Sequence, residues 1–488
     1  MITLTAMASL LPDAVATASG CLLTGGVVAV LPAAAAAAPA EGAVGTLPMA
    51  VLGIVMLATY ALIATGRLHK LTAALCGAIV CVLVGLLFGV LHEYEEVHAV
   101  LAKDIGVLGV IVGTSILVDV AGKSGLFQFL AVKIAKKAKG DPQRLFTSLV
   151  ILTVLFVSLL TIAPGTLIVV SLSLVLCRTL QLDPKPYLVG VAICANSGAL
   201  VTFASGICTL MVGSAAKLPY AHFFLVSTPM ALATAAVAWW VVKRFYRDRL
   251  IADPATREER EAAVASFDEW AMVSDRRVFW RSAGLLLLTI AGFASAQAFG
   301  VGLDFVAMAG GAAAILFSGQ NPEEAVKKVN WTVIVFFIGL FVMIGTVEHS
   351  GLLQQAAGLL SDVSGGNVHV ASIVLVIFTA VTSGIMDNIP VAATMIPIVA
   401  TMTQELPAAP LWWGLTISAN LGGNGTPIGS ISGVIALSAL QEGGHEKVTW
   451  GEWFKVGGVT MALQLVVVIV WLTMFTVFDL YPELPGPS

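Results

Sequence analysis

Long apolar runs are the feature that most constrains how this chain can fold. About 20 consecutive, mostly apolar residues span a bilayer as a helix, and many runs of the chain approach that length. Only 11% of the residues are charged, against about 25% in soluble domains, so most of the surface cannot face water. We therefore predict an integral membrane protein. The runs are 47–66, 71–91, 105–122, 145–163, 223–242, 283–303, 331–347, 370–386 and 461–478.

Further apolar stretches, which begin near Pro164, Tyr187, Asn388 and Trp412, are interrupted by Gly, Pro or Asn. Non-helical backbone at membrane depth is tolerated only where protein covers it or where water fills a cavity. We therefore predict an all-α polytopic membrane protein with roughly 11–13 embedded segments, which include re-entrant hairpins and broken helices.

Three sequence matches indicate an internal repeat, because partner stretches are separated by a nearly constant distance along the chain. The first pair are amphipathic stretches, the second pair read Ser-Gly-Leu, and the third pair read Ile-x-Ala-Asn-x-Gly. The matched stretches begin at Tyr94 and Pro322, at Ser124 and Ser350, and at Ile193 and Ile417.

The basic residues indicate that the two repeats have inverted topology. The first Ser-Gly-Leu is followed by a basic stretch, from Lys133 to Arg144, whereas the equivalent residues 354–369 contain no Lys or Arg. Basic loops stay cytoplasmic, so equivalent loops face opposite sides, as in the inverted repeats of secondary transporters. The predicted divisions are an N-terminal leader or extra helix at 1–46, a first repeat at 47–243, a cytoplasmic linker at 244–282, a second repeat at 283–480 and a tail at 481–488.

Asp387 and Asn388 lie inside an otherwise apolar region, close to Pro390. A charged group at the centre of a spanning helix costs about 2.5–3.5 kcal/mol on insertion scales. Pro390 removes a backbone donor and disfavours helical geometry at Ile389. We predict a re-entrant hairpin or broken helix, where Asp387, Asn388 and free carbonyls bind a cation, or where Asp387 takes a proton. The alternative is that Asp387 only caps a half-helix.

A second polar constellation lies in the glycine-rich stretch 419–433, which cannot form an ordinary lipid-facing helix. Its neutral oxygens and amides suit a small cation, a carboxylate or a hydroxylated solute, although the glycines alone could serve packing. The candidate ligands are Asn420, Asn424, Thr426 and Ser430. The predicted helix-breaking residues are Pro164, Pro390, Gly422, Gly423, Gly425 and Pro427.

The strings DNIPVAATMIP, from Asp387, and ANLGGNGTPIG, from Ala419, resemble second-repeat signatures of the ion transporter superfamily. The strongest resemblance is to the arsenite-pump and sodium–proton antiporter family (ArsB/NhaD), which is citrate-transporter-like and includes the melanosomal P protein. It extends from about residue 47 to the C-terminus. The resemblance implies a scaffold and transport elements, with two facing hairpins at the site. Asp387, Asn388, Asn420 and Thr426 fall on the motif positions of the family.

The first repeat departs from the family pattern, which usually has an Asp-Asn or Ser-Asn pair at the hairpin tip. When the hairpins are aligned on Ser158 and Ser383, Ile162 and Ala163 stand where the second repeat has its Asp-Asn pair. We therefore expect the carboxylate of the second repeat alone to carry the coupling charge. The polar candidates of the first repeat are Thr161, Thr166, Asn196 and Thr202.

These features favour secondary active transport by alternating access, coupled to H⁺ and/or Na⁺, with cation–proton antiport as the preferred reaction. The candidate proton carriers are Asp387 and Asp119, although Asp119 also fits a helix end near water. We expect a transient Na⁺ between Asp387 and Asn420. The alternatives are a permease for a small anion such as citrate or a dicarboxylate, arsenite efflux with Cys194 and Cys208 near the first broken segment, and an ion channel.

Several classes of function find no support in the sequence. It contains no Walker-type phosphate loop, and its histidines are scattered rather than clustered as in a membrane enzyme. The cysteines lack metal-ligand spacing, so we expect neither a structural metal nor any cofactor apart from bound Na⁺. The expected partners are the lipid bilayer and a small ion or solute, not nucleic acid. A homodimer and, for an arsenite pump, an accessory ATPase are further alternatives. We expect the bacterial inner membrane as the location.

Overall fold

The computed structural model describes residues 45–251, 257–271, 273, 275–319 and 321–483. All regular secondary structure within these ranges is helical, which confirms the all-α polytopic fold. Ten of the described helical segments are long and apolar enough to cross a membrane, and three shorter apolar helices accompany them. The predicted leader or extra helix at 1–46 lies almost entirely outside the described residues, as does most of the tail.

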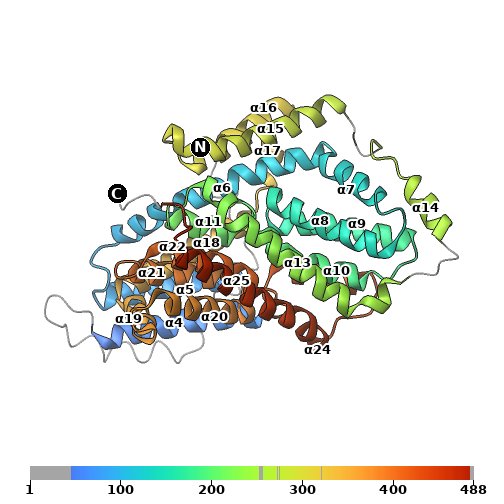
Figure 1. The fold of residues 1–488 in the computed structure, drawn as a ribbon. Coiled ribbons are helices and arrows are strands. Elements are labelled where there is room, and N and C mark those ends of the chain that lie inside the picture. The colour runs from blue at the N-terminus through green and yellow to red at the C-terminus, as the bar shows by residue number, and fades with distance from the viewer. Residues whose placement is uncertain (1–44, 252–256, 272, 274, 320, 484–488) are drawn as a thin grey trace.

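One set of helices is uninterrupted, and we call it the continuous group. Within it α6 packs along α16, and α5 packs along α18 (Figure 1). Small residues allow the first pair to approach closely, because a Cβ atom at Gly113 would overlap the backbone of Ala307. The group consists of α4 (Thr46–Thr65), α5 (Lys70–Leu87), α6 (Glu95–Lys123), α15 (Arg276–Ser295), η4 (Ala296–Phe299), α16 (Leu303–Ser318), α17 (Pro322–Lys327) and α18 (Trp331–His349).

The remaining helices of the first repeat include short helices and long helices that meet at sharp breaks. Together with their counterparts in the second repeat they form what we call the interrupted group. In Figure 1, α8 and α9 lie side by side as the two arms of a hairpin. These elements are α7 (Leu126–Lys136), α8 (Pro142–Leu160), α9 (Ile162–Thr179), α10 (Lys185–Gly198), α11 (Ile207–Ala215), α12 (Tyr220–His222), the π-helix η1 (Phe223–Ser227), α13 (Thr228–Phe245) and η2 (Arg247–Leu250).

The linker helix α14 (Arg257–Ala265) is followed by the second repeat, which has the same order of elements as the first. Its helices of the continuous group come first, and its interrupted helices follow. Its interrupted helices are α19 (Leu352–Ser364), α20 (Val368–Ile385), α21 (Asn388–Met402), α22 (Ala408–Gly422), α23 (Ile431–Glu442), α24 (Trp450–Trp453), the π-helix η5 (Phe454–Gly458) and α25 (Val459–Val477).

Local backbone details also recur in the two repeats. Gly125 and Gly351, the glycines of the two Ser-Gly-Leu motifs, precede α7 and α19 with φ of 80° and 82°. This left-handed conformation is readily accessible only to glycine. A short helix followed by a π-helix also opens the last long helix of each repeat. The element order therefore agrees with the predicted duplication, and the inverted relation of the halves stays a prediction.

The interrupted helices of the two repeats pack against each other crosswise. The half-helix α11 of the first repeat packs against α21 and α22, and the half-helix α23 of the second packs against α9 and α10. This arrangement brings the broken segments of both repeats to the centre of the molecule, where they can form one site.

Candidate functional site

A cavity of about 500 Å³ lies between the continuous and the interrupted group. Its wall includes both hairpin tips, parts of α5 and α6, the start of α11 and the segment before α18. The predicted residues on this wall are Asp119, Thr161, Pro164, Asp387 and Asn388. The cavity is therefore the place where the structure brings candidates from both repeats together.

The tip of the second hairpin is formed by Met386 and Asp387, between α20 and α21. Met386 has extended geometry, and Asp387 is the N-cap of α21, where its Oδ1 accepts a hydrogen bond from the backbone N–H of Ile389 at 3.3 Å. The capping role is thus real, and the second carboxylate oxygen faces another partner. Pro390 lies in the first turn of α21, where a missing N–H is tolerated, so the chain breaks just before the position we predicted.

Lys70 is that partner, and the sequence analysis missed it. Its Nζ lies 3.5 Å from Oδ2 of Asp387, and the two side chains are 27% and 21% exposed. The ammonium also lies 5.7 Å from the ring centre of Phe336 on α18, within the range of a cation–π interaction. A lysine at the start of a spanning helix resembles an interfacial anchor, so the sequence gives no direct signal for this ion pair.

The tip of the first hairpin is a single residue, Thr161, between α8 and α9. It has φ 78° and ψ 168°, a region that is essentially restricted to glycine. Pro164 and Pro390 occupy equivalent places in the first turns of α9 and α21. This correspondence shifts the predicted alignment by one residue, so that Thr161, rather than Ile162, stands where the second repeat has Asp387.

Asn420 lies near the end of α22 and is completely buried. Its Nδ2 donates to Thr209 Oγ1 at 3.1 Å and to the carbonyl of Thr416 at 2.9 Å. Its Oδ1 has no hydrogen-bond partner within the described part of the chain. A buried unpartnered carbonyl oxygen is unfavourable, so Asn420 presents a free ligand atom in the interior.

The glycine-rich break is closely tied to the hairpin tip. Thr426 Oγ1 donates to the carbonyl of Gly384 at 2.6 Å, and Ser383 donates to the carbonyl of Ala419 at 2.7 Å. The glycines permit this approach, since a Cβ atom at Gly422 would overlap the carbonyl of Ala380. A Cβ atom would likewise crowd its neighbours at Gly423 and at Gly425. Pro427 lies in the loop between α22 and α23.

Asn196 occupies the place in the first repeat that Asn420 occupies in the second. Its Nδ2 donates across the repeat boundary to Asn424 Oδ1 at 2.7 Å and to Ser430 Oγ at 3.1 Å. The Nδ2 of Asn424 donates to Gln464 Oε1 at 2.9 Å. Gln464 was missed, although a glutamine within the apolar run 461–478 was a visible signal. These residues form a polar network that joins the repeats and does not line the main cavity.

The remaining predicted residues lie in different surroundings. Thr202 Oγ1 donates to the carbonyl of Ser158 at 3.1 Å, and Thr202 lines a neighbouring cavity of about 230 Å³. Thr166 is buried, and its hydroxyl has no hydrogen-bond partner among the described residues. Asp119 faces the cavity near the end of α6 and forms an ion pair of 2.7 Å with Lys123.

A separate ionic cluster joins the repeats away from the cavity. Lys185 is only 1% exposed, and its Nζ lies 2.8 Å from Glu452 and 3.1 Å from Glu446. Arg249 binds Glu446 at 2.6 Å and Asp183 at 3.0 Å. The hydrogen bond from Arg249, followed by that from Lys185, lowers the pKa of Glu446 to about 2. This cluster is a fixed junction between the start of α10 and the segment before α24.

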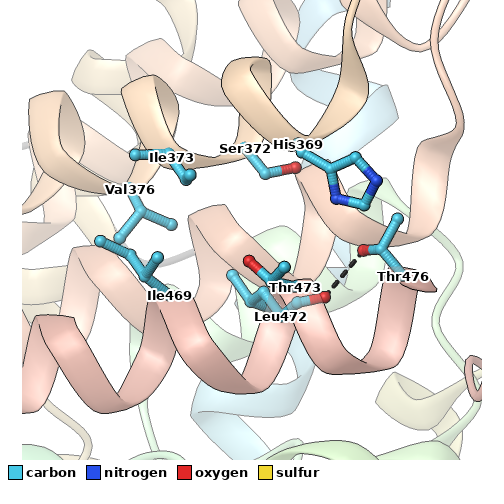
Figure 2. Close-up of a pocket in the computed structure, with 8 residues that line it drawn as sticks. All are labelled: His369, Ser372, Ile373, Val376, Ile469, Leu472, Thr473 and Thr476. Atoms are coloured by element: carbon cyan, nitrogen blue, oxygen red, sulfur yellow. Dashed lines mark hydrogen bonds between the residues drawn. The ribbon is translucent and has the colours of Figure 1, made fainter. Parts of the chain in front are cut away.

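Figure 2 shows a third, much smaller cavity between α20 and α25. Its volume of about 10 Å³ is roughly that of one water molecule. The Nδ1 of His369 and the hydroxyl of Ser372 face it, and neither has a hydrogen-bond partner in the described part of the chain, so one water could satisfy both. The space is too small for a solute.

Comparisons with known proteins agree with this architecture. A family model described as citrate transporter matches residues 60–418. An uncharacterized transporter of Mycobacterium bovis is 29% identical over 427 residues, which cover 86% of this chain and 97% of the relative. The mouse P protein is 25% identical over 499 residues, which cover 86% of this chain and 59% of the P protein.

A solved structure is also similar to this chain. The crystal structure of the Alcanivorax borkumensis YdaH transporter superimposes with a TM-score of 0.54 at 14% sequence identity. The match covers 89% of this chain and 99% of that chain. At this identity the likeness concerns the fold alone. It extends over both repeats, and the expected resemblance to citrate-transporter-like proteins and to the P protein is confirmed by the sequence matches.

Proposed function

Because this chain belongs to the citrate transporter family and is an integral membrane transporter, we propose that it exchanges a small cation for protons by alternating access, with Asp387 as the coupling group. The observation that carries this proposal is the position of the carboxylate. Asp387 lies at a helix break on the wall of the central cavity, largely removed from water. A cation or a proton there neutralises a charge that is otherwise costly to move across the bilayer.

The oxygen ligands near the break support a small, hard cation such as Na⁺ or Li⁺. Asn420 does not line the cavity, but its buried Oδ1 has no hydrogen-bond partner among the described residues. The hydrogen bond from Thr426 to Gly384 holds the break against the tip. Carboxylate and carbonyl oxygens are the ligands that such cations prefer. Asp119, which already pairs with Lys123 at 2.7 Å, is the weaker candidate for the proton carrier.

A carboxylate-bearing anion is the second candidate substrate. Two lysines, Lys70 and Lys328, line the cavity, and the matching family model is described as citrate transporter. An anion would bind Lys70 in place of Asp387, whereas a cation would bind Asp387 in place of Lys70. Arsenite efflux has less support, since Cys208 lines the cavity and Cys194 does not.

The protein's setting in the membrane is part of the proposal. We place it in the bacterial inner membrane with the linker 244–282 on the cytoplasmic side, because the linker is rich in basic residues. The function proposed is transport without catalysis. An ion channel is the alternative of a different class, and it would not accumulate its ion against a gradient.

The test is ion-driven pH change in proteoliposomes that contain the full chain. Na⁺ or Li⁺ is added to vesicles with an acidic lumen, and collapse of the pH gradient is recorded. We expect a response from the native chain and none from Asp387→Asn. The matched control is Asp362→Asn, which makes the same change at an exposed position of α19 and should behave like the native chain.

Two results contradict the proposal. An unchanged response in Asp387→Asn assigns coupling to another group. If the native chain does not respond to either ion, cation–proton exchange fails for these ions, and uptake of radiolabelled citrate into the same vesicles tests the anion alternative.

A further inference from the structure

The ion pair between Lys70 and Asp387 is an ionic link between the continuous and the interrupted group. The two groups also meet through the hydrogen bond between Tyr60 and Thr394 and through packing of α18 against α21. Lys70 begins α5 of the continuous group, and Asp387 caps α21 of the interrupted group. Most packing of α5 is with α4 and α18, whereas α21 packs mainly with α11, α19 and α22. A shift of α5 against α21 would lengthen this pair, which is already 3.5 Å long.

The surroundings of Lys70 hold its ammonium weakly. Lys70 is the first residue of α5, where the positive end of the helix dipole opposes a cation. The described residues place one carboxylate against it, at 3.5 Å, and the face of Phe336 beside it. Lys185, by contrast, is buried between two carboxylates at 2.8 Å and 3.1 Å.

We propose that Lys70 is a built-in competing cation, which occupies the carboxylate of Asp387 when no transported cation is bound there and is displaced when one binds. This inference rests on the proposed cation exchange, and it names the event that starts the conformational change, namely displacement of Lys70 from Asp387. A cation that displaces the ammonium removes the ion pair between α5 and α21, so binding itself weakens the attachment of the interrupted group to the continuous group.

The consequence is that the native chain binds its cation more weakly than a chain without the lysine. The experiment measures binding of ²²Na⁺ to the purified full chain in detergent at constant pH, with unlabelled Na⁺ and Li⁺ as competitors. We expect Lys70→Met to lower the dissociation constant about twofold to fivefold, the range expected for loss of a partly exposed ion pair. Lys70→Arg keeps a competing cation and should bind about as weakly as the native chain.

The matched control is Lys103→Met, which removes a lysine of α6 from an ion pair of 3.9 Å with Glu348 outside the cavity wall. It should leave the dissociation constant unchanged. If Lys70→Met does not fold, as judged by gel filtration and thermal unfolding, Lys70→Gln takes its place because it keeps a polar side chain of similar length.

The outcomes separate this inference from the proposed function. Binding that depends on Asp387 but does not tighten in the folded Lys70 variant overturns the competition. The same holds if the variant loses binding of radiolabelled citrate without any gain for Na⁺, since Lys70 is then an anion ligand. If neither the native chain nor the Lys70 variant binds Na⁺ or Li⁺ through Asp387, the proposed cation exchange itself fails, and competition at that carboxylate fails with it.

Discussion

The two hairpin tips share the order helix, tip, helix, but they present different side chains to the cavity. Each tip joins two helical arms, and in each the second arm carries a proline in its first turn, Pro164 or Pro390. The first tip presents the hydroxyl of Thr161, without a capping hydrogen bond, whereas the second presents the carboxylate of Asp387. Both face one cavity, so a symmetric fold surrounds a site whose charge is asymmetric.

The two asparagines behind the tips differ in the same way. Both amides have an unpartnered Oδ1 in the described structure. The Nδ2 of Asn196 donates to two side chains of the other repeat, Asn424 and Ser430. That of Asn420 donates to one side chain of the other repeat, Thr209, and to its own helix. Asn196 thus makes more of its hydrogen bonds across the repeat boundary than Asn420 does, and we expect Asn420 to be the stronger ion ligand.

The largest expected effect comes from comparing the tips directly. We expect Asp387→Asn to abolish ion-driven pH change in proteoliposomes, because it removes the coupling charge. We expect Thr161→Val, which is similar in shape and only loses a hydroxyl, to keep at least about a fifth of the initial rate, since one neutral polar contact contributes about 1 kcal/mol or less. Equal losses in the two variants would show that the tips share the ion, and the asymmetric site would have to be abandoned.

The asparagines give the next largest effect. Asn420→Ala should raise the dissociation constant for Na⁺ about tenfold, because a ligand oxygen to a charged ion contributes about 1.5 kcal/mol or more. Asn196→Ala should change it less than about threefold and instead lower the midpoint of thermal unfolding, because Asn424 and Ser430 lose a buried partner. Binding of ²²Na⁺ and thermal unfolding, both in detergent, separate the two cases. The reverse pattern would assign the ion to the first repeat.

The spanning helices were predictable from the sequence because a bilayer demands long apolar runs, whatever their neighbours are. The broken segments were predictable for the converse reason, since Asp387 and the glycines around Asn420 cannot lie in ordinary lipid-facing helices. The alignment of the tips was wrong by one residue because the linkers differ in length. Thr161 stands alone in the first, whereas Met386 precedes Asp387 in the second, and side-chain identity does not reveal this.

Residues that act across the tertiary structure were not predictable in the same way. Lys70 lies more than 300 positions before its partner, and its place at a helix start has an adequate local explanation as an interfacial anchor. Tyr60 likewise looks like any aromatic of a spanning helix, yet its hydroxyl lies 2.5 Å from that of Thr394 on α21. Sequence patterns indicate the secondary structure and membrane insertion of one segment. These contacts depend instead on which segments pack together in the fold.

A smaller effect is expected from the backbone of the first tip. Thr161 has a positive φ, in a region that costs a residue other than glycine about 1–3 kcal/mol. Thr161→Gly should therefore raise the free energy of unfolding by about 1 kcal/mol, after part of the gain is offset by the flexibility of glycine in the unfolded chain. Asp387 has φ −59°, so Asp387→Gly should not stabilise. The midpoints of thermal unfolding in one detergent test both, and a lower midpoint in Thr161→Gly would mean that the threonine side chain holds the tip.

The smallest effect concerns the ionic cluster that joins the repeats. Arg249 and Lys185 lower the pKa of Glu446 from 4.5 to about 2, so its contribution to stability is fully present above about pH 4.5 and is lost as the pH falls towards 2. The thermal midpoint of the native chain should therefore fall more steeply over this range than that of Glu446→Gln. Glu446 is exposed to solvent, which keeps the difference small.

The control for this pH dependence is Glu442→Gln, which removes a carboxylate at the end of α23 without touching the cluster, and should follow the native chain. Above about pH 4.5 the native chain should have a higher thermal midpoint than Glu446→Gln. The two curves of midpoint against pH should converge in acid. Parallel curves would mean that Arg249 and Glu446 add nothing to the junction. Packing of α10 against α23 and the buried hydrogen bonds of Asn196 would then hold the two repeats together.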